Sequence, residues 1–416
     1  MLARAAVALA VATAQPLLAQ HGDHVGSDST RRGRVGAMAV VLGSHANPAA
    51  LGRPVTEGYV SQPMLFGDVQ LAGGRVAALA TLNFEGATLS RGEINPGGYG
   101  EGYIDRRHPH TYLHEAMLGV AGRRGAVGAS LFAGKGFVPF GTDDPMVRPF
   151  VKYPVNHHHA QLMERGLVAA ALQLPGGTLE LARFNGDEPE GASDWPNAGR
   201  ALDSWAARTT VFAPGGVELS ASAAHVRSPE FASGEGLDQR KASASLRLVR
   251  GSGAWRYALA EWARTREGAS AGPRFAFTSL LAEGAWQLRG VQLAARAERT
   301  ERPEEDRLDD PYRSVRPLLD FNILGRTRWD IVTVQLSAPG RRLAGARVAP
   351  FVEGAWLAPR ALAHPTPMDP RIFYDASRLW MLSGGVRLHA GAMRPRFGRY
   401  GAAQRHVGDA STPRAH

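Results

Sequence analysis

Two histidine clusters are the residues of this chain best suited to chemistry. The first is Asp105-Arg106-Arg107-His108-Pro109-His110, followed by His114 and Glu115, and the second is Asn156-His157-His158-His159, with Glu164 downstream. His108, His110 and His114 are all at even-numbered positions, so an extended chain places them on one face. Imidazole nitrogens and carboxylate oxygens together are ligands for a divalent metal such as zinc or copper. Metal binding is therefore predicted for His108, His110, His114, His157, His158 and His159; in the alternative reading these rings only hydrogen-bond loops together, and no cofactor is bound.

A second feature is the segment 137–155, which begins Phe137-Val138-Pro139-Phe140-Gly141-Thr142-Asp143-Asp144-Pro145-Met146. An exposed loop would not normally show this many apolar and aromatic groups to water. Folding inward as a constriction or partial plug would bury them, and so would packing as an extracellular flap against neighbouring loops. Asp143 and Asp144 could add carboxylate ligands to the histidines.

Catalytic patterns are poorly developed. The chain offers no nucleophile-elbow setting and no His-Glu-x-x-His sequence. The Gly-rich stretch 97–102 lies in an expected loop without the strand-to-helix context of a phosphate site. We therefore predict no enzyme; a hydrolase acting on membrane lipid through a lipid-facing Ser/His pair is the catalytic alternative.

The elements that must position these residues are long β-strands. In 241–248, Ala242, Ala244, Leu246 and Leu248 alternate with Lys241, Ser243, Ser245 and Arg247, and 217–223 and 291–298 alternate in the same way. The runs 255–266 and 275–288 are longer than the ~5–6 residues typical of globular strands. A tilted strand that crosses a membrane needs about 9–11 residues. Strand length therefore favours a transmembrane barrel over a soluble sandwich.

Short Gly/Pro-rich turns recur along the chain with longer polar loops between them. Seven such turns lie at 73–74, 122–125, 175–177, 214–216, 251–253, 289–290 and 339–342. Each joins two strands, which predicts fourteen strands between about 59 and 358. A further strand near 377–391 and a first strand near 34–43 would close the ring at sixteen, with fourteen as the fallback. The predicted fold is an all-β transmembrane antiparallel up-and-down barrel with short periplasmic turns and long extracellular loops.

Some charged residues occupy strand positions whose alternation places them on the lumen side. They should point away from lipid, because a charge facing lipid at the midplane costs about 2–4 kcal/mol. Trp and Tyr, including Trp329 and Tyr400, tend to fall near strand ends, either as an interfacial girdle or by chance. The predicted lumen-lining residues are Arg165, Arg208, Glu218, Lys241, Arg247, Arg264, Arg296, Glu298, Glu353 and Arg387.

The ends of the chain predict export. Residues 1–19 resemble a signal peptide cleaved after Ala14 or Ala19. Residues 20–33 should be a flexible periplasmic leader, 34–392 the barrel and 393–416 a C-terminal tail. With no cysteine, a disulfide framework is excluded. The net charge of +10 comes from dispersed arginines, which argues against nucleic acid as a partner. The expected partners are outer-membrane lipid and lipopolysaccharide, the barrel-assembly machinery and small solutes.

Several stretches together resemble a known group of proteins. They are 100–110, 140–146 and Phe184-Asn185-Gly186-Asp187-Glu188-Pro189, together with Glu301-Arg302-Pro303-Glu304-Glu305. The sequence resembles uncharacterised bacterial outer-membrane porin-like β-barrel proteins over most of residues 59–400. The resemblance implies a fold and a place in the outer membrane, and it carries over no functional residue.

The expected function is passage or gating of small solutes, anions or metal ions among them, by a barrel in the bacterial outer membrane. One alternative is a His-rich metal-binding barrel without free conduction. A second is a soluble exported β-propeller, whose blades also recur every 40–50 residues but need four strands each.

Overall fold

The computed structural model describes residues 33–49, 52–89, 93–96, 104–107, 110–142, 144–189, 191–250, 252–269, 272–305, 323–363, 369–393 and 396–404. The predicted signal peptide, most of the leader, His108 and Asp143 lie outside these residues.

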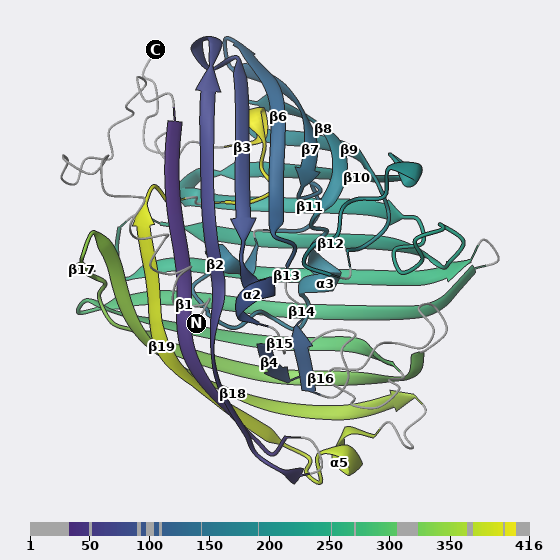
Figure 1. The fold of residues 1–416 in the computed structure, drawn as a ribbon, viewed down its shortest axis with the longest axis vertical. Coiled ribbons are helices and arrows are strands. Elements are labelled where there is room, and N and C mark those ends of the chain that lie inside the picture. The colour runs from purple at the N-terminus through teal and green to yellow at the C-terminus, as the bar shows by residue number, and fades with distance from the viewer. Residues whose placement is uncertain are drawn as a thin grey trace.

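One antiparallel sheet forms a closed ring of sixteen strands, as predicted (Figure 1). The strands of the wall are β1 (Gly33–Asn47), β2 (Val55–Leu71), β3 (Val76–Asn83), β6 (Leu113–Arg124), β7 (Val127–Gly136), β8 (Arg165–Leu174), β9 (Gly177–Phe184), β10 (Ser204–Ala213), β11 (Val217–Val226), β12 (Asp238–Val249), β13 (Trp255–Ala269), β14 (Gly272–Leu288), β15 (Val291–Glu305), β16 (Ile323–Ser337), β18 (Ala346–Ala363) and β19 (Leu379–Gly391). The small strand β17 (Arg341–Leu343) pairs with the start of β18.

The ring closes where the first and last strands meet. β1 pairs antiparallel with β19 from Gly36↔Gly391 to Asn47↔Trp380, and its other edge pairs with β2. No edge of this wall is left open, so every backbone group of the ring can find a partner without water. A single ring differs from radially arranged blades, and the β-propeller alternative is therefore wrong.

Side chains alternate between the two faces of the wall. On β13, Leu259, Glu261, Ala263 and Thr265 point inward and are buried, whereas Trp262 points outward and is 36% exposed. The outward face carries many large apolar groups that are similarly exposed, among them Leu118, Leu131, Leu181, Val211, Leu280, Val332 and Trp356. Such a surface would be unfavourable in water and is favourable against lipid chains.

No helix in the described ranges is both long and apolar enough to cross a membrane.

Short turns and long loops fall at opposite ends of the ring, which we call the short-turn end and the long-loop end. In barrels of this kind the short turns face the periplasm. The long loops carry the two-stranded sheet of β4 (Glu93–Pro96) and β5 (Ile104–Arg107) and the one-turn helices α2 (Glu85–Thr88), α3 (His157–Ala160) and α5 (Pro370–Phe373). Single 3-10 turns are η3 (Ala72–Gly74), η4 (Pro145–Val147), η5 (Ala198–Arg200), η6 (Pro214–Gly216) and η7 (Gly401–Ala403).

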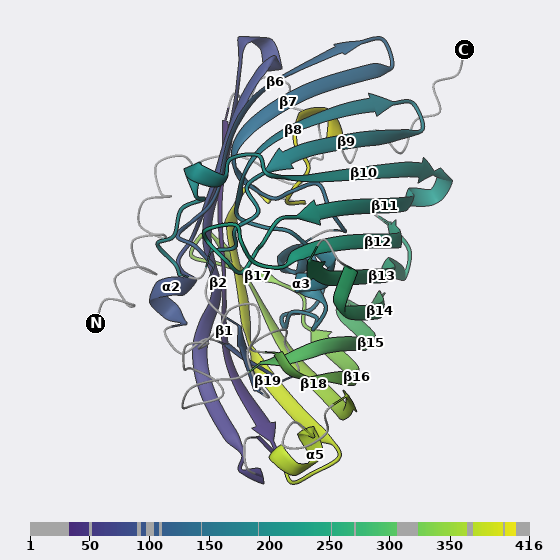
Figure 2. The same cartoon turned by 90° about the vertical axis from the view of Figure 1, so that its right-hand side faces the viewer.

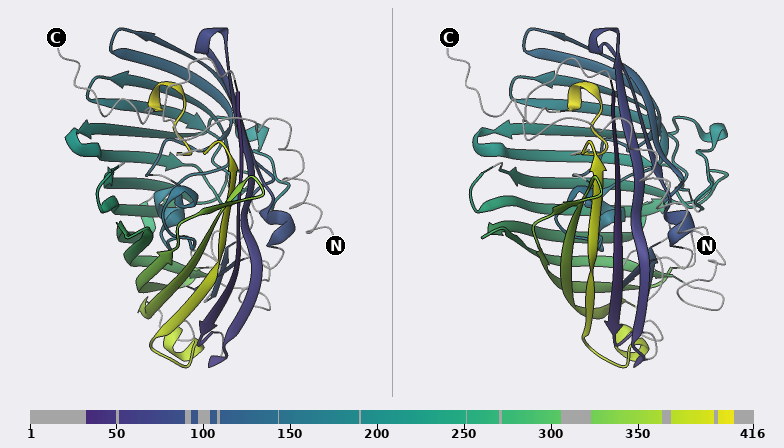
Figure 3. Two further views of the ribbon diagram at one scale, coloured as in Figure 1. Left: turned by 90° about the vertical axis from the view of Figure 1, so that its left-hand side faces the viewer. Right: turned by 60° about the vertical axis from the view of Figure 1, so that its left-hand side comes forward.

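Two parts of the chain lie inside the ring. Residues 137–164, the inward segment, include α3, which lies between β1 and β2 on one side and β13 and β14 on the other (Figure 2). Residues 396–404, the tail seal, end in η7 against β6, β7, β8 and β9 (Figure 3). The inward segment therefore follows the plug prediction, not the extracellular flap.

Three side chains face the opposite way from the sequence prediction. Trp329 and Tyr400 are buried inside the ring and belong to no interfacial girdle. Arg264, expected in the lumen, shares the outer face of β13 with Trp262, because the inward positions are the odd-numbered ones. It lies toward the long-loop end of its strand, where lipid head groups replace hydrocarbon and a charge is tolerated.

Candidate functional site: the filled lumen

The inward segment is anchored on several sides of the barrel by apolar groups. Val151 packs with Val40, Leu42 and Phe351. Phe150 packs with Ala285 and Ala294 on β14 and β15. Val155 joins a third cluster that includes Trp329. Because these contacts reach well-separated strands, the segment crosses the lumen instead of lining one side of it.

Charged wall residues hold the backbone of this segment in place. The Val151 N–H donates to Glu353 Oε2 at 3.0 Å, and the Val155 N–H donates to Glu298 Oε2 at 2.8 Å. Arg387 donates to the Phe150 carbonyl at 3.0 Å, and Arg296 donates to the Lys152 carbonyl at 3.0 Å. Hydrogen bonds to a charged partner contribute about 1.5–3 kcal/mol each. The segment is thus tied to the wall by polar contacts that water could replace.

Lys152 is the buried cation of the inward segment. Its Nζ lies 2.8 Å from Glu93 Oε1 and also donates to the Tyr59 hydroxyl. Burial lowers the pKa of this ammonium, but Glu93 and Tyr59 more than offset that effect, so the pKa lies above its ordinary value. The ion pair fixes the loop strand β4 against the middle of the inward segment.

The tail seal is held by a dense set of ion pairs near the short-turn end. Arg208 bonds both oxygens of Glu180, at 2.7 and 2.8 Å, and Arg399 reaches the same carboxylate at 2.6 Å. Glu218 accepts from Arg396 at 2.9 Å and lies 3.4 Å from Arg247. Four guanidinium groups therefore surround two carboxylates in this seal.

Tyr400 joins the tail seal to the start of the inward segment. Its ring stacks on Phe132 at 5.8 Å, and its hydroxyl accepts from the Phe137 N–H at 2.8 Å and donates to Glu115 Oε1 at 2.7 Å. Arg208 completes the link by donating to the carbonyls of both Gly141 and Gly398. The two inner parts consequently form one connected body.

Most of the ten predicted lumen residues make contacts inside the ring. Arg165 lies 3.4 Å from Glu188, and Lys241 donates to the His158 carbonyl at 2.9 Å. The contacts of Arg208, Glu218, Arg247, Arg296, Glu298, Glu353 and Arg387 are given above, and Arg264 is the outward exception. These side chains could have lined water or paired across the lumen. Eight of the ten contact the inner segments or one another, and Arg165 pairs with the loop residue Glu188.

Part of the first histidine cluster converges with a residue from the second. His114, at the start of β6, has its Nδ1 2.5 Å from Oε1 of Glu164, which directly precedes β8. Nδ1 of His110 lies 3.6 Å from the same oxygen, and the two rings meet edge to face at 4.7 Å. One potential ligand atom from each residue falls within 4.8 Å of the others. All three side chains are buried.

The described histidines of the second cluster do not join this group, and His108 lies outside the described residues. His158 Nδ1 lies 3.6 Å from Glu188, and His159 contacts the Thr265 hydroxyl and the Glu301 carbonyl. His157 meets His158 and Tyr153 edge to face, and the ring of Tyr153 in turn lies 6.2 Å from His110. Of the six predicted histidines, the described residues bring His110 and His114 together with Glu164, the carboxylate downstream of the second cluster. Metal binding itself stays a prediction.

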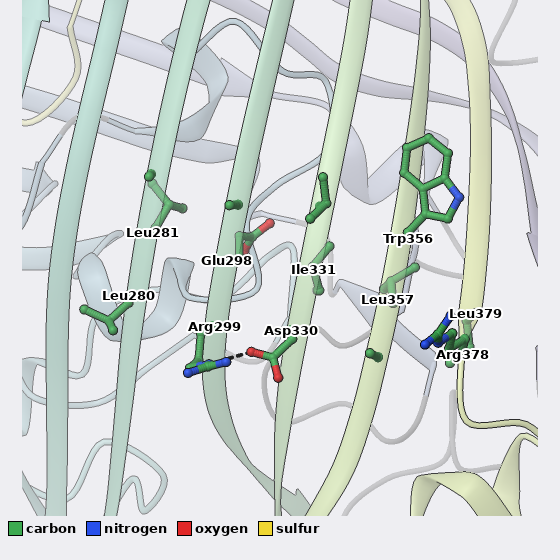
Figure 4. Close-up of a pocket in the computed structure, with 14 residues that line it drawn as sticks. Leu280, Leu281, Glu298, Arg299, Asp330, Ile331, Trp356, Leu357, Arg378 and Leu379 are labelled. Atoms are coloured by element: carbon green, nitrogen blue, oxygen red, sulfur yellow. Dashed lines mark hydrogen bonds and ion pairs between the residues drawn. The ribbon is translucent and has the colours of Figure 1, made fainter.

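A groove on the outer face of the wall is distinct from the lumen (Figure 4). It is lined by runs of consecutive residues on β14, β15, β16 and β18 and by Arg378 and Leu379 at the start of β19, with Leu280, Val332 and Trp356 among its exposed apolar groups. Arg299 and Asp330 pair at 2.5 Å on its floor. Its exposed groups, Leu280, Val332 and Trp356, face outward, so the groove opens on the outer face of the wall.

No protein-family model matches the chain, and no curated protein sequence matches it. Solved structures do. The anion-selective porin from Comamonas acidovorans has a TM-score of 0.50 at 10% identity, over 86% of this chain and 99% of the porin. A loop L8 deletion mutant of OmpT, an outer membrane protein of Vibrio cholerae, has a TM-score of 0.48 at 10% identity, over 86% and 100%. OpdK of Pseudomonas aeruginosa, crystallised with vanillate, has a TM-score of 0.41 at 11% identity, over 86% and 99%.

At such identities the likeness to the Comamonas porin concerns the fold. Together with the closed ring and its apolar outer face, it identifies a porin-like barrel of the bacterial outer membrane.

Proposed function

We propose that this protein is a gated channel, which passes small solutes when the inward segment moves aside. The observation that carries the proposal is how that segment is attached. Its backbone hydrogen-bonds to wall side chains such as Glu298, Glu353 and Arg387, and it adds no strand to the wall.

The inward segment has the character of a movable part. Its regular structure amounts to one 3-10 turn, η4, and one helical turn, α3. Its departure would break side-chain contacts but no hydrogen bond of the β-ladder, so the wall could remain intact. The charged side chains left behind would then be hydrated, as they would be in a water-filled channel.

The size of the ring supports conduction once the segment has moved. Sixteen strands enclose enough space for an aqueous path, in contrast to eight-stranded barrels that side chains fill. Four guanidinium groups against two carboxylates in the tail seal would raise the local concentration of anions. The expected solutes are therefore small anions.

Single-channel recording in planar bilayers tests the proposal. Purified protein should show discrete openings separated by closed periods, with a reversal potential in a salt gradient that indicates anion preference. Heat-modifiable migration in detergent gels should verify the fold of each sample. A correctly folded and inserted protein that never passes current would overturn the proposal.

The second candidate function is a barrel that binds metal and does not conduct. It is favoured by the buried group of His110, His114 and Glu164. Lipopolysaccharide and the assembly machinery stay predicted partners on the strength of the fold alone.

A further inference from the structure

We propose that His110, His114 and Glu164 form a binding site for one divalent transition-metal ion of the zinc or copper class. This inference rests on the proposed function in one respect, because the ion would lie at the base of the inward segment that is proposed to move. Metal binding itself does not require that the channel open.

Three separate parts of the chain meet at this site. His114 belongs to wall strand β6, His110 to the loop before it, and Glu164 to the last position of the inward segment. Glu164 is held in place by Thr111, whose N–H and hydroxyl donate to its Oε1 at 2.9 and 3.0 Å. Its backbone has a φ of +61°, a conformation that a glutamate seldom adopts. The carboxylate is thus held by its surroundings in a position facing both imidazoles.

The Nε2 atoms of the two rings are a second feature of the site. Nε2 of His110 and Nε2 of His114 are buried and have no hydrogen-bond partner among the described residues. Leaving such a group without a partner costs about 1–3 kcal/mol. The Nδ1 atoms, which lie 3.6 and 2.5 Å from Glu164 Oε1, are the nitrogens placed to bind the ion. A neutral imidazole that binds a metal through Nδ1 carries its proton on Nε2.

The surrounding charge favours a cation. The carboxylates of Asp144, Glu115 and Glu85 lie near enough to act electrostatically on one or other of the two imidazoles. Oδ2 of Asp144 is itself buried without a hydrogen-bond partner in the described part of the chain. A divalent ion would partly neutralise this acidic surrounding.

The donor atoms select the type of metal. Two imidazole nitrogens and a carboxylate are typical of zinc and copper sites, whereas calcium and magnesium prefer oxygen alone. The chain has no cysteine, so thiolate does not compete. With metal–ligand bonds of about 2.0–2.1 Å, ligand atoms lie about 3.3 Å apart. His114 and Glu164 would need to separate by less than about 1 Å to admit the ion.

Calorimetric titration of the chelator-stripped full chain in detergent with ZnCl2 and CuCl2 tests the site. One tight site per chain is expected, weakened at least about tenfold in His114→Ala and in the isosteric Glu164→Gln. His225→Ala is the matched control, because His225 also pairs with a carboxylate, Asp238 at 3.0 Å, but lies partly exposed at the long-loop end of β11. This control should titrate as the wild type does.

A titration of the His110→Ala/His114→Ala double variant that matches the wild type would overturn the proposal. X-ray absorption of the zinc-loaded wild type gives a reading that needs no variant: scattering from two imidazoles supports the site, and scattering from none contradicts it. Neither measurement depends on current through the channel. A bilayer recording without current would therefore not contradict the metal site, and a titration without metal binding would not contradict the channel proposal.

Discussion

The tail seal and the histidine group both bury charged or polar side chains inside the barrel, but they differ in how those groups are satisfied. In the tail seal, Glu180 bonds two guanidinium groups, and Glu218 bonds one and lies close to another. In the histidine group, two imidazole nitrogens lack hydrogen-bond partners in the described ranges. The first region pairs each carboxylate with guanidinium groups, although Nε of Arg247 and Nε of Arg399 also lack hydrogen-bond partners in the part of the chain that the structure describes, and the second has the capacity to take a ligand.

The two regions therefore bury their polar side chains in different ways. Ion pairs that bond each other repay part of their desolvation and hold a segment in one place. Unsatisfied donors and acceptors weaken the fold unless something binds them. We therefore expect the tail seal to contribute its stability in the protein alone, and the histidine group to contribute more stability once metal is bound.

The largest effect is expected from Tyr400→Ala in the tail seal. The substitution removes a buried ring and both hydrogen bonds of its hydroxyl, and should lower the free energy of unfolding by about 3–5 kcal/mol. Urea unfolding in detergent micelles measures it. Tyr400→Phe, which keeps the ring, should lose about 1–2 kcal/mol, and equal losses in both variants would contradict the packing argument.

The histidine group should show the opposite dependence. Without metal, His110→Phe should change the free energy of unfolding by less than about 1 kcal/mol, since Nε2 of His110 has no hydrogen-bond partner among the described residues and its Nδ1 lies 3.6 Å from Glu164. Zinc at about 100 times its dissociation constant should stabilise the wild type by about 2.7 kcal/mol. The variant should gain far less. Urea midpoints with zinc and with chelator give the result, and stabilisation of the variant equal to that of the wild type would contradict it.

The strand pattern could be predicted from sequence because each strand is encoded locally. Alternation in 241–248 and the turns at 214–216 and 289–290 involve neighbouring residues, and the observed β12, β13 and β15 follow the predicted ranges within a few residues. Arg264 was placed on the wrong face because a charge was assumed to avoid the outer surface at every height. Whether a charge is tolerated on the outer face depends on its height in the membrane. The charge of one residue does not indicate that height.

The contents of the lumen could be predicted only in part. The apolar composition of 137–155 already indicated that this segment is buried. That the segment is held by Glu298 and Glu353 depends on contacts between residues far apart in the chain. The tail seal was missed, although Phe397 and Tyr400 were a signal, because a solvated tail has no need of aromatics. The pairing of Glu164 with His114 spans a separation of 50 residues and has no local signature.

Acid should favour opening through His159 on α3. Burial, and then the charge of Lys241 and the neighbouring His158, lower the pKa of this ring well below its ordinary value. A hydrated ring in an open state would regain a pKa near 6.5. The open state then binds more protons, so opening should increase by up to roughly tenfold between about pH 7.5 and 5.5. Bilayer recordings at both pH values measure it, and His159→Asn should lose this part of the dependence; an unchanged response would rule His159 out.

A smaller effect is expected where the wall holds the inward segment. Glu353→Gln keeps an acceptor for the Val151 N–H but removes its charge, a loss of about 1 kcal/mol. The open probability should rise roughly fivefold. Glu235→Gln, in an exposed loop, is the control and should leave the open probability unchanged.

The most direct test of the account fixes the inward segment to the wall. The Val151 N–H donates to the Gln335 side chain at 2.9 Å, and the chain contains no natural cysteine to interfere. Val151→Cys/Gln335→Cys can therefore be joined by a short, reducible bifunctional thiol reagent during bilayer recording, with each single cysteine variant as its control. The account predicts that current in the double variant disappears on cross-linking and returns on reduction. Undiminished current through the cross-linked barrel would show that the solute path does not depend on movement of this segment.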